Sequence, residues 1–411
     1  MPKPLYVGID VHKRQNTACF MDQEGNQIGK AFSFPNSLPG AQHLEQTIKE
    51  VMEEGGFGTL LLATESTSLL DFHLIDFLAS SQVLEAYQSQ IFQFNPKVIR
   101  GFKKSYPDKD KTDPEDAFVI SDRLRFGRLP KPYQGQKAWV PLQRLTRYRY
   151  HLAGTMAREK AYFLSHLFLK YSAFTSLKPF SNTFGATSQA FITEFFSVDE
   201  VAEMSVEALA SFICEHGKNR FPDPKKTLEV IKKVTRESYR IRPTLSTSDT
   251  LILASTLQNI RALTQSPKEV NKAIAKEFAA FPNTLISVKG LGPVYSAGIF
   301  AEIGEIQRFD SQAQLAKFAG LTWRKLASGD FLGEITRMTK SGNQYLRYYL
   351  IEAANSLRVH NEEYRAYYQA KYQEVPLHQH KRALALTARK LVRLVFALLA
   401  KNQLYQPSVI V

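Results

Sequence analysis

Four carboxylates in the first third of the chain have the types and the spacing of a metal-binding site. Asp10 lies near the end of the first β-rich run, and Glu65 ends the apolar run 59–65, which is typical of a buried strand. A carboxylate inside a sheet must be paired or bind a cation. Asp113 and Asp116 are three residues apart, so a helix would place them on one face. Two Mg²⁺ ions about 4 Å apart, held by such carboxylates, would clamp a scissile phosphate from both sides, which is phosphoryl-transfer chemistry.

A plainer interpretation of the second pair stays open. Asp113 could serve only as a helix N-cap, and Asp116 could be a solvated first-turn acid that the helix dipole stabilises. His12 and Lys13 follow Asp10 closely and could contact phosphate, although a single histidine at the end of a strand is more often structural.

The elements that must position these carboxylates follow the order βββαβαβα. The predicted strands are 5–11, 17–21, 28–34, 59–65 and 83–87, and the predicted helices are 41–52, 69–78, 96–102 and 113–125. This order predicts an α/β domain with a mixed sheet and helices on its faces, the layout of an RNase H-like domain. In such a sheet the first and fourth strands are neighbours, which would bring Asp10 and Glu65 together.

The composition changes after Pro130-Lys131-Pro132, and we place a domain boundary near residue 135. Residues 136–280 are predicted to form a helical, coiled-coil linker with a dimerisation role and an insertion. Its long helices are expected at 142–170 and 250–278, with a further basic helix near 225–240.

Residues 281–411 are predicted to form a third, mostly α-helical domain. Gly290-Leu291-Gly292-Pro293, followed by an Ala/Ile-rich helix, has the form of a helix-hairpin-helix, in which backbone N–H groups approach a phosphate. A plain tight turn explains the glycines equally well. A polar loop containing Ser328-Gly329 leads to Lys340-Ser341-Gly342-Asn343, which has the form of a phosphate-binding helix start. Helices are expected at 315–323, 345–357 and 384–399.

Charge indicates a polyanionic partner. The chain carries 53 Lys and Arg against 39 Asp and Glu, a net charge of +14. Residues 1–130 hold 14 basic and 17 acidic residues, so the remaining chain carries the whole surplus, at +17. Basic residues alternate with aromatic ones at 144–150 and 347–349, which suits phosphate contacts and base stacking. Two alternatives stay open: the basic residues could form only a solvated surface, and the aromatic residues could belong to the hydrophobic core.

Several classes of protein are disfavoured. Cys19 and Cys214 are the two cysteines, so we expect neither a disulfide scaffold nor a cysteine zinc site. The low cysteine count favours a reducing, cytoplasmic location. No apolar run reaches the roughly 20 residues of a membrane span. Because a strand is predicted almost at the first residue, we expect no signal peptide.

The ordered motifs resemble the DEDD transposases of insertion sequences, relatives of the Piv-type DNA invertases. In the first domain the resemblance rests on Gly8-Ile9-Asp10-Val11-His12-Lys13, the Glu65 strand and Lys111-Thr112-Asp113-Pro114-Glu115-Asp116. In the last domain it rests on Gly290-Leu291-Gly292-Pro293, Phe318-Ala319-Gly320-Leu321, Ser328-Gly329 with Gly333, and Lys340-Ser341-Gly342-Asn343 with Leu346-Arg347. It covers roughly residues 1–175 and 280–405, and Glu334 and the interior Pro114-Glu115 depart from the family pattern.

The resemblance implies a RuvC-like catalytic domain with a Mg²⁺-bound site at Asp10, Glu65, Asp113 and Asp116. It implies that Ser328 is the DNA nucleophile and forms a covalent phosphoserine link, with Ser341 as the competing serine. Relatives of this kind join donor and target DNA under a structured bridge RNA, as dimers that pair into a tetramer. We expect nucleic-acid contacts from basic residues, glycines and one amide of the matched and basic segments: Lys13, Lys111, Arg144, Arg147, Gly290, Gly292, Arg337, Lys340, Asn343 and Arg347.

Two other functions stay open from the sequence. A RuvC-like, metal-dependent endonuclease that cuts branched DNA would use the same four carboxylates without the serine. A non-catalytic nucleic-acid-binding protein would leave the acidic cluster inert.

Overall fold

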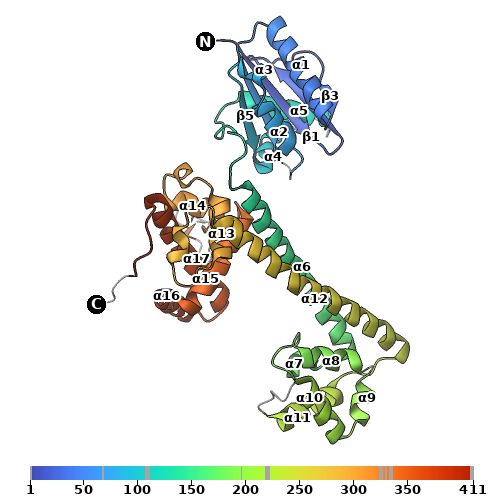
Figure 1. Ribbon diagram of the computed structural model, residues 1–411. Helices are drawn as coiled ribbons and strands as arrows, with labels where there is room; N and C mark the ends of the chain where they lie inside the picture. Colours follow the sequence, from blue (N-terminus) through green and yellow to red (C-terminus); the bar gives the residue numbers. More distant parts are fainter. Residues whose placement is uncertain are drawn as a thin grey trace. The chain divides into compact units, whose positions relative to one another are not determined.

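The chain folds into two compact units, Met1–Ala138 and Trp139–Val411. The computed structural model describes residues 2–66, 69–106, 112–195, 197–217, 223–323, 327–328, 331–332 and 337–407, with backbone alone at 243–245, 327–328 and 331–332. The first unit is a mixed five-stranded sheet with helices, and the second is mostly helical (Figure 1). The expected α/β class of the first domain and the helical class of the remainder are therefore confirmed.

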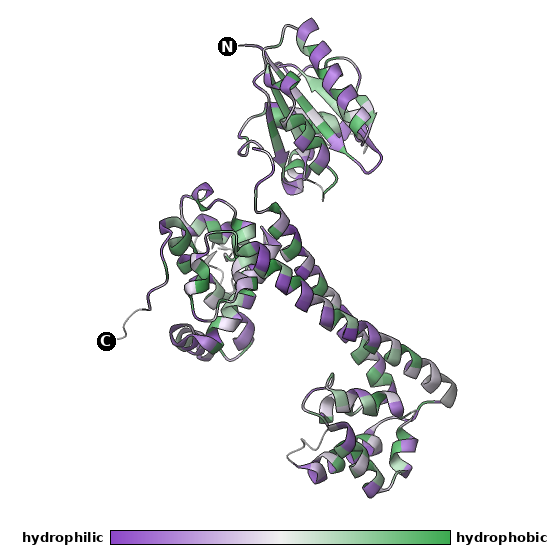
Figure 2. Cartoon of the chain, in the orientation of Figure 1, coloured by the Kyte–Doolittle hydropathy of each residue, from purple (hydrophilic) through white to green (hydrophobic). Residues whose placement is uncertain are grey.

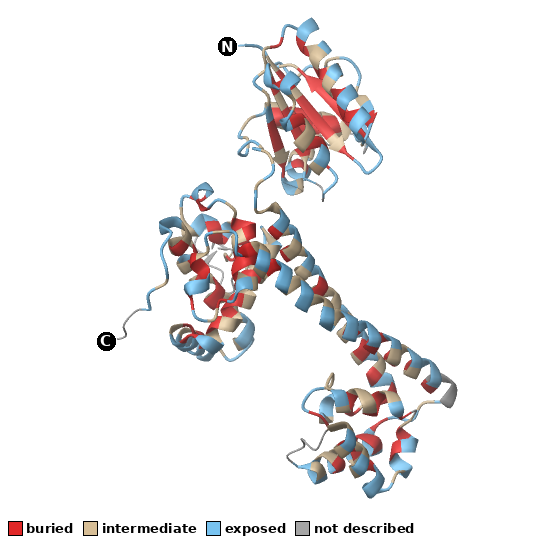
Figure 3. Cartoon of the chain, viewed as in Figure 1, coloured by how far each residue is buried: buried red, intermediate tan, exposed pale blue. Residues whose placement is uncertain are grey.

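The sheet of the first unit has the strand order β3-β2-β1-β4-β5. Its strands are β1 Pro4–Val11, β2 Gln15–Met21, β3 Phe32–Pro35, β4 Thr59–Glu65 and β5 Gln90–Phe94. The first three strands form an antiparallel meander, whereas β1, β4 and β5 run parallel. The strands are mostly hydrophobic and buried (Figures 2 and 3). The expected pairing of the first strand with the fourth is confirmed.

Helices cover both faces of this sheet. Because successive strand residues point to opposite sides, the strands contribute apolar side chains to a core on each face. The helices of the unit are α1 Leu38–Glu54, α2 Phe72–Ala79, α3 Gln82–Glu85, α4 Pro96–Lys103 and α5 Asp113–Arg125. Leu5, Val7 and Ile9 of β1 share a hydrophobic core with α1 and α2. On the other face, residues of β4 and β5 share a second core with α4 and α5.

One predicted strand of the first unit is wrong. Residues 83–87 were expected to be extended, but they lie mostly in the helical turn α3, and the fifth strand follows at Gln90–Phe94. Ser81 explains the difference, because its hydroxyl accepts a hydrogen bond from Leu84 N and so caps a helical turn. Ile91, Phe92 and Phe94 bury their side chains in the sheet instead.

The second unit begins with a long helix that packs along another long helix (Figure 1). These are α6 Val140–Lys170 and α12 Pro243–Phe278, near the two long helices predicted for the middle of the chain. Five shorter helices connect them: α7 Phe174–Leu177, α8 Ala186–Glu194, α9 Val198–Glu203, α10 Val206–Gly217 and α11 Pro224–Glu237. Aromatic and aliphatic side chains of these helices form one core with the adjoining parts of α6 and α12.

The last part of the chain forms a separate hydrophobic core. Its elements are the 3₁₀ turns η1 Thr284–Ser287 and η2 Ile306–Arg308, the short strands β6 Ala327–Ser328 and β7 Phe331–Leu332, and the helices α13 Pro293–Ile303, α14 Gln312–Ala319, α15 Gln344–His360, α16 Glu362–Gln373 and α17 Gln379–Lys401. A single 3₁₀ turn, η1, precedes Gly290, so the helix-hairpin-helix stays a prediction. Within the described residues, no helix is both long enough and apolar enough to cross a membrane.

Candidate functional site

Asp10 and Glu65 lie at the same end of two neighbouring parallel strands. The register pairs Gly8 with Ala63 and Ile9 with Thr64, so the next residues along the strands are Asp10 and Glu65. Both follow the alternation that faces α4 and α5, because Leu61 and Ala63 belong to the core on that side. The tertiary structure thus places these two carboxylates side by side on one face of the sheet.

Helix α5 lies against this same face and carries the other two carboxylates. Thr112 occupies its N-cap position, so Asp113 and Asp116 belong to its first turn. Gly8 allows the close approach: a Cβ on Gly8 would lie 2.3 Å from Ser121 N and 2.5 Å from Ala117 O. The Gly8 backbone N–H also donates to Ser121 Oγ at 2.8 Å. This contact between strand and helix brings the two halves of the carboxylate cluster together.

His12 joins the two halves directly. Its Nε2 lies 3.1 Å from Asp10 Oδ2 and 3.3 Å from Asp113 Oδ1. One ligand atom from each of these three side chains lies within 4.8 Å of the others. The Asp10 side chain is 16% exposed, whereas those of His12 and Asp113 are 54% and 59% exposed. The cluster is therefore mostly buried at Asp10 and open to solvent at His12 and Asp113.

Burial raises the pKa of Asp10 above its usual value. His12 opposes this shift, and the negative charges of Asp116 and Asp113 increase it. Asp116 itself contacts the ammonium of Lys103 from α4. Asp113 and Asp116 are therefore close enough to repel Asp10, and His12 and Lys103 lie against these carboxylates with basic groups.

These residues fit a divalent cation. A hard ion such as Mg²⁺ prefers carboxylate oxygens, and one oxygen each of Asp10 and Asp113 lies within 4.8 Å of the other. A divalent ion bound between them would offset the burial that raises the pKa of Asp10. His12 offers a nitrogen donor at the same place.

Three of the predicted nucleic-acid contacts are engaged within the protein. Arg147 donates to Glu302 at 2.7 and 2.9 Å, and Asn343 donates to the same carboxylate at 2.7 Å. Arg347 donates to the Ala319 carbonyl at 3.0 Å. These side chains therefore have structural partners.

The remaining predicted contacts lie mostly at the surface. Lys13, Arg144, Arg337 and Lys340 are exposed side chains. Gly292 is the exposed N-cap residue of α13.

Gly290 is enclosed rather than open. It has a φ of +102°, and a Cβ there would lie 3.1 Å from His360 Cβ. Its glycine identity therefore has a local conformational reason.

Two predicted site residues lie partly or wholly outside the described residues. Lys111 is outside them. Ser328 is described in its backbone alone: it ends β6 and pairs with Phe331 of the antiparallel strand β7. Its role stays a prediction.

Sequence reasoning gave little weight to His12 and missed Lys103 and Glu302. Glu302 carried a usable signal, because a carboxylate in the apolar run Ile299-Phe300-Ala301-Glu302-Ile303 needs a buried partner. His12 and Lys103 had no such signal, because only the tertiary structure brings His12 to Asp113 and Lys103 to Asp116.

Two protein families match the chain: the first match runs from the first unit into the second, and the other lies within the second unit. A family described as "Transposase" matches residues 7–171, and one described as "Transposase IS116/IS110/IS902 family" matches residues 283–369. The chain is also similar to the insertion element IS116 uncharacterized 44.8 kDa protein of Streptomyces clavuligerus, with 24% identity over 98% of this chain and 96% of that protein.

These matches indicate an enzyme of DNA transposition. The two family matches together cover about three fifths of the chain and include both Asp10 and the helix α15 region. The chain belongs to the IS110/IS116 family of insertion-element transposases.

Proposed function

We propose that this transposase cuts and rejoins donor and target DNA through a Mg²⁺-dependent carboxylate site in an RNase H-like, RuvC-like first domain. The observation that carries the proposal is the convergence of Asp10 and Asp113 around His12, with Glu65 on the strand beside Asp10. The strand order β3-β2-β1-β4-β5, with its parallel pairing of β1 and β4, supports the RNase H-like assignment.

Asp10, Glu65, Asp113 and Asp116 would hold the metal. A bound divalent ion would neutralise these carboxylates and stabilise charge on a scissile phosphate. The protein contributes the rigid placement of its ligands: β1 and β4 hold Asp10 and Glu65, and the Gly8 contact fixes α5. Lys103 adds positive charge beside Asp116, and Lys13, which follows His12 in the chain, would add more when DNA binds.

Ser328 is the proposed nucleophile. Its Oγ forms a bond to phosphorus, the bond from phosphorus to the deoxyribose oxygen breaks, and the proton of the serine ends on the released sugar hydroxyl. The resulting phosphoserine conserves the energy of the phosphodiester. Attack by a hydroxyl of a second DNA strand then reverses the step and joins the strands without ATP.

The proposed guide is a structured bridge RNA encoded by the element, and the proposed assembly is a dimer that pairs into a tetramer. The charge of the chain supports an additional polyanion, because residues 131–411 carry the entire positive surplus. Base pairing would then supply the sequence specificity, while the protein binds backbone phosphates.

The experiment is a search for a denaturant-stable protein–DNA adduct. Purified protein, RNA transcribed from the flanking element and Mg²⁺ are incubated with end-labelled DNA, and the products are resolved under denaturing conditions. We expect an adduct with the wild-type protein and with Ser341→Ala, and no adduct with Ser328→Ala. Asp10→Asn, Glu65→Gln, Asp113→Asn and Asp116→Asn should each abolish recombination while RNA binding stays nearly unchanged.

The other outcomes assign other functions. Cleaved DNA without an adduct, unchanged in Ser328→Ala, would make the protein a metal-dependent endonuclease. DNA binding without any Mg²⁺-dependent chemistry would make the acidic cluster inert. Loss of RNA binding in all four carboxylate variants would contradict the assignment of these residues to a metal site.

A further inference from the structure

Glu302 is a buried carboxylate at the junction of three helices of the second unit. It lies in the apolar helix α13, and its side chain is fully buried. Arg147 of α6 donates two hydrogen bonds to it, Nε to Oε1 at 2.7 Å and a terminal nitrogen to Oε2 at 2.9 Å. Asn343, the N-cap residue of α15, donates Nδ2 to Oε2 at 2.7 Å. A buried carboxylate with three such bonds holds its partners in one arrangement.

Asn343 transmits this arrangement to the start of α15. Its Oδ1 accepts hydrogen bonds from the backbone N–H groups of Tyr345 and Leu346, both at 2.9 Å. The amide is therefore engaged at both ends, with the helix on one side and Glu302 on the other. The Arg147 guanidinium also stacks over the Tyr345 ring at 4.6 Å, which ties α6 to the same helix turn.

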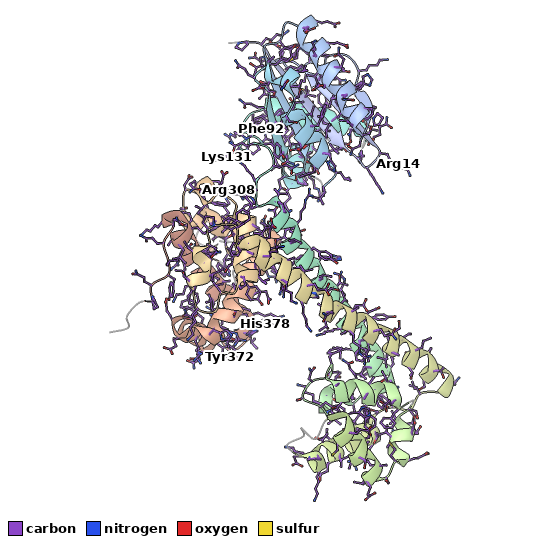
Figure 4. The ribbon with its side chains drawn as sticks, viewed as in Figure 1. Arg14, Phe92, Lys131, Arg308, Tyr372 and His378 are labelled. Carbon is purple, nitrogen blue, oxygen red and sulfur yellow. The ribbon has the colours of Figure 1, made fainter. Side chains whose placement is uncertain are left out.

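The turn 339–343 is held from its other side by the end of α14. Asn343 N donates to Phe318 O at 2.7 Å, and Thr339 N donates to Thr322 O at 2.8 Å. Gly342 has a φ of +133°, and a Cβ there would lie 2.3 Å from Phe318 O. Arg308, labelled in Figure 4, stacks over the Phe318 ring at 4.5 Å. The backbone of the turn has little freedom to move.

Lys340 is an exposed residue of the turn 339–343, and it is the residue of this turn that carries a positive charge. It adopts a left-handed backbone conformation, with a φ of +50°, that a residue with a side chain rarely takes. The surrounding hydrogen bonds keep it there, so its ammonium leaves the protein from a fixed backbone position. A lysine presented in this way suits a phosphate group.

We propose that Glu302 is a positioning residue, which holds the turn 339–343 so that Lys340 contacts a phosphate of the DNA backbone. This deepens the proposed function, on which it rests for DNA as the ligand. Arg147 and Asn343 act through Glu302 within the protein, and Lys340 makes the contact with DNA.

The experiment measures the salt dependence of DNA binding by the full-length protein, with one labelled duplex and fluorescence anisotropy. Each phosphate contact contributes about 0.9 to the slope of log K against log salt. Lys340→Gln should therefore flatten the slope by about one unit. Glu302→Gln should flatten it by the same amount, although removal of a negative charge would by itself favour DNA binding. The double variant should show no further change, because both substitutions remove the same contact.

Two further variants separate positioning from a merely structural role. Glu362→Gln makes the same charge change at an exposed site of α16 and should leave the slope unchanged. Asn343→Asp keeps an N-cap that is as good as Asn, but it places a second carboxylate against Glu302. Asn343→Asp should flatten the slope as Lys340→Gln does. The double variant Glu302→Gln with Asn343→Asp should recover at least part of the wild-type slope, because an amide at position 302 then faces a carboxylate at position 343.

The proposal is overturned if Glu302→Gln and Asn343→Asp lower the thermal stability but leave the salt slope at the wild-type value. It is also overturned if the effects of Lys340→Gln and Glu302→Gln on the slope add. Its failure is distinct from that of the proposed function, because binding is measured without strand cleavage. A protein with the expected slopes that forms no Ser328 adduct would keep this inference and lose the phosphoserine mechanism.

Discussion

Gly8→Ala tests whether the contact between β1 and α5 assembles the carboxylate site. The added methyl group would lie 2.3 Å from Ser121 N, 2.5 Å from Ala117 O and 2.6 Å from Ser121 Oγ. Ordinary contact begins at about 3.4 Å, and two of these three atoms are backbone atoms of α5 that cannot rotate away. Strand and helix must therefore separate by roughly 1 Å.

The magnitude follows from two contributions. Overpacking of this kind costs about 1–3 kcal/mol. The buried hydrogen bond from Gly8 N to Ser121 Oγ, 2.8 Å long, would be stretched at a further cost of about 1 kcal/mol. We expect the free energy of unfolding to fall by about 2–4 kcal/mol. Because Asp10 lies on β1 and Asp113 on α5, a 1 Å displacement should also slow DNA strand cleavage by about 100-fold.

Urea unfolding of the first unit, followed by circular dichroism, measures the first effect, and the rate of Mg²⁺-dependent cleavage measures the second. Gly101→Ala is the matched control, since Gly101 lies within α4 and a Cβ there has open space. It should keep full activity and gain about 0.5–1 kcal/mol from better helix propensity. Wild-type stability and activity in Gly8→Ala would refute the argument that this close approach positions the site.

Three other expectations are open to measurement. Without added metal at neutral pH, Asp10→Asn should unfold at a higher urea concentration than the wild type, because burial and two nearby carboxylates disfavour the charge of Asp10. Mg²⁺ should raise the melting temperature of the wild type and not of this variant. The same response to Mg²⁺ in both proteins would contradict a metal site at Asp10. Burial lowers the pKa of Lys170 to about 8, against about 10.5 when unfolded, so the unfolded chain holds the proton over that interval and stability should rise by about 3 kcal/mol from pH 8 to 10.5. Lys170→Met should remove this rise, and an equal pH profile in both proteins would exclude Lys170 as its source. Finally, log K for DNA should fall steeply with log salt, and a flat response would exclude phosphate neutralisation by the basic second unit.

The local sequence determined most of the elements that carry the site. Thr59–Glu65 and Asp113–Arg125 have the predicted bounds, because a continuous apolar run and a Pro at the first helical turn are strong local signals. The strand expected at 83–87 failed for a local reason too, since the Ser81 cap outweighed the apolar residues that follow.

The resemblance of the ordered motifs also led to the right family of transposases. It could not say which of the matched residues are exposed. Arg147 and Asn343 have the residue types of nucleic-acid contacts, yet both bind the buried Glu302. Their partner lies 155 and 41 residues away along the chain, and no local pattern reports such a distance.

What the sequence determined by itself is therefore most of the strands and helices that carry the predicted carboxylates, and the placement of positive charge after residue 130. Tertiary structure alone decided that His12 lies between Asp10 and Asp113, that Lys103 contacts Asp116, and that Glu302 anchors the turn before α15. Secondary structure responds to neighbours within a few residues, which the sequence displays directly. Contacts among charges depend on how strands and helices pack, and packing is a property of the whole fold.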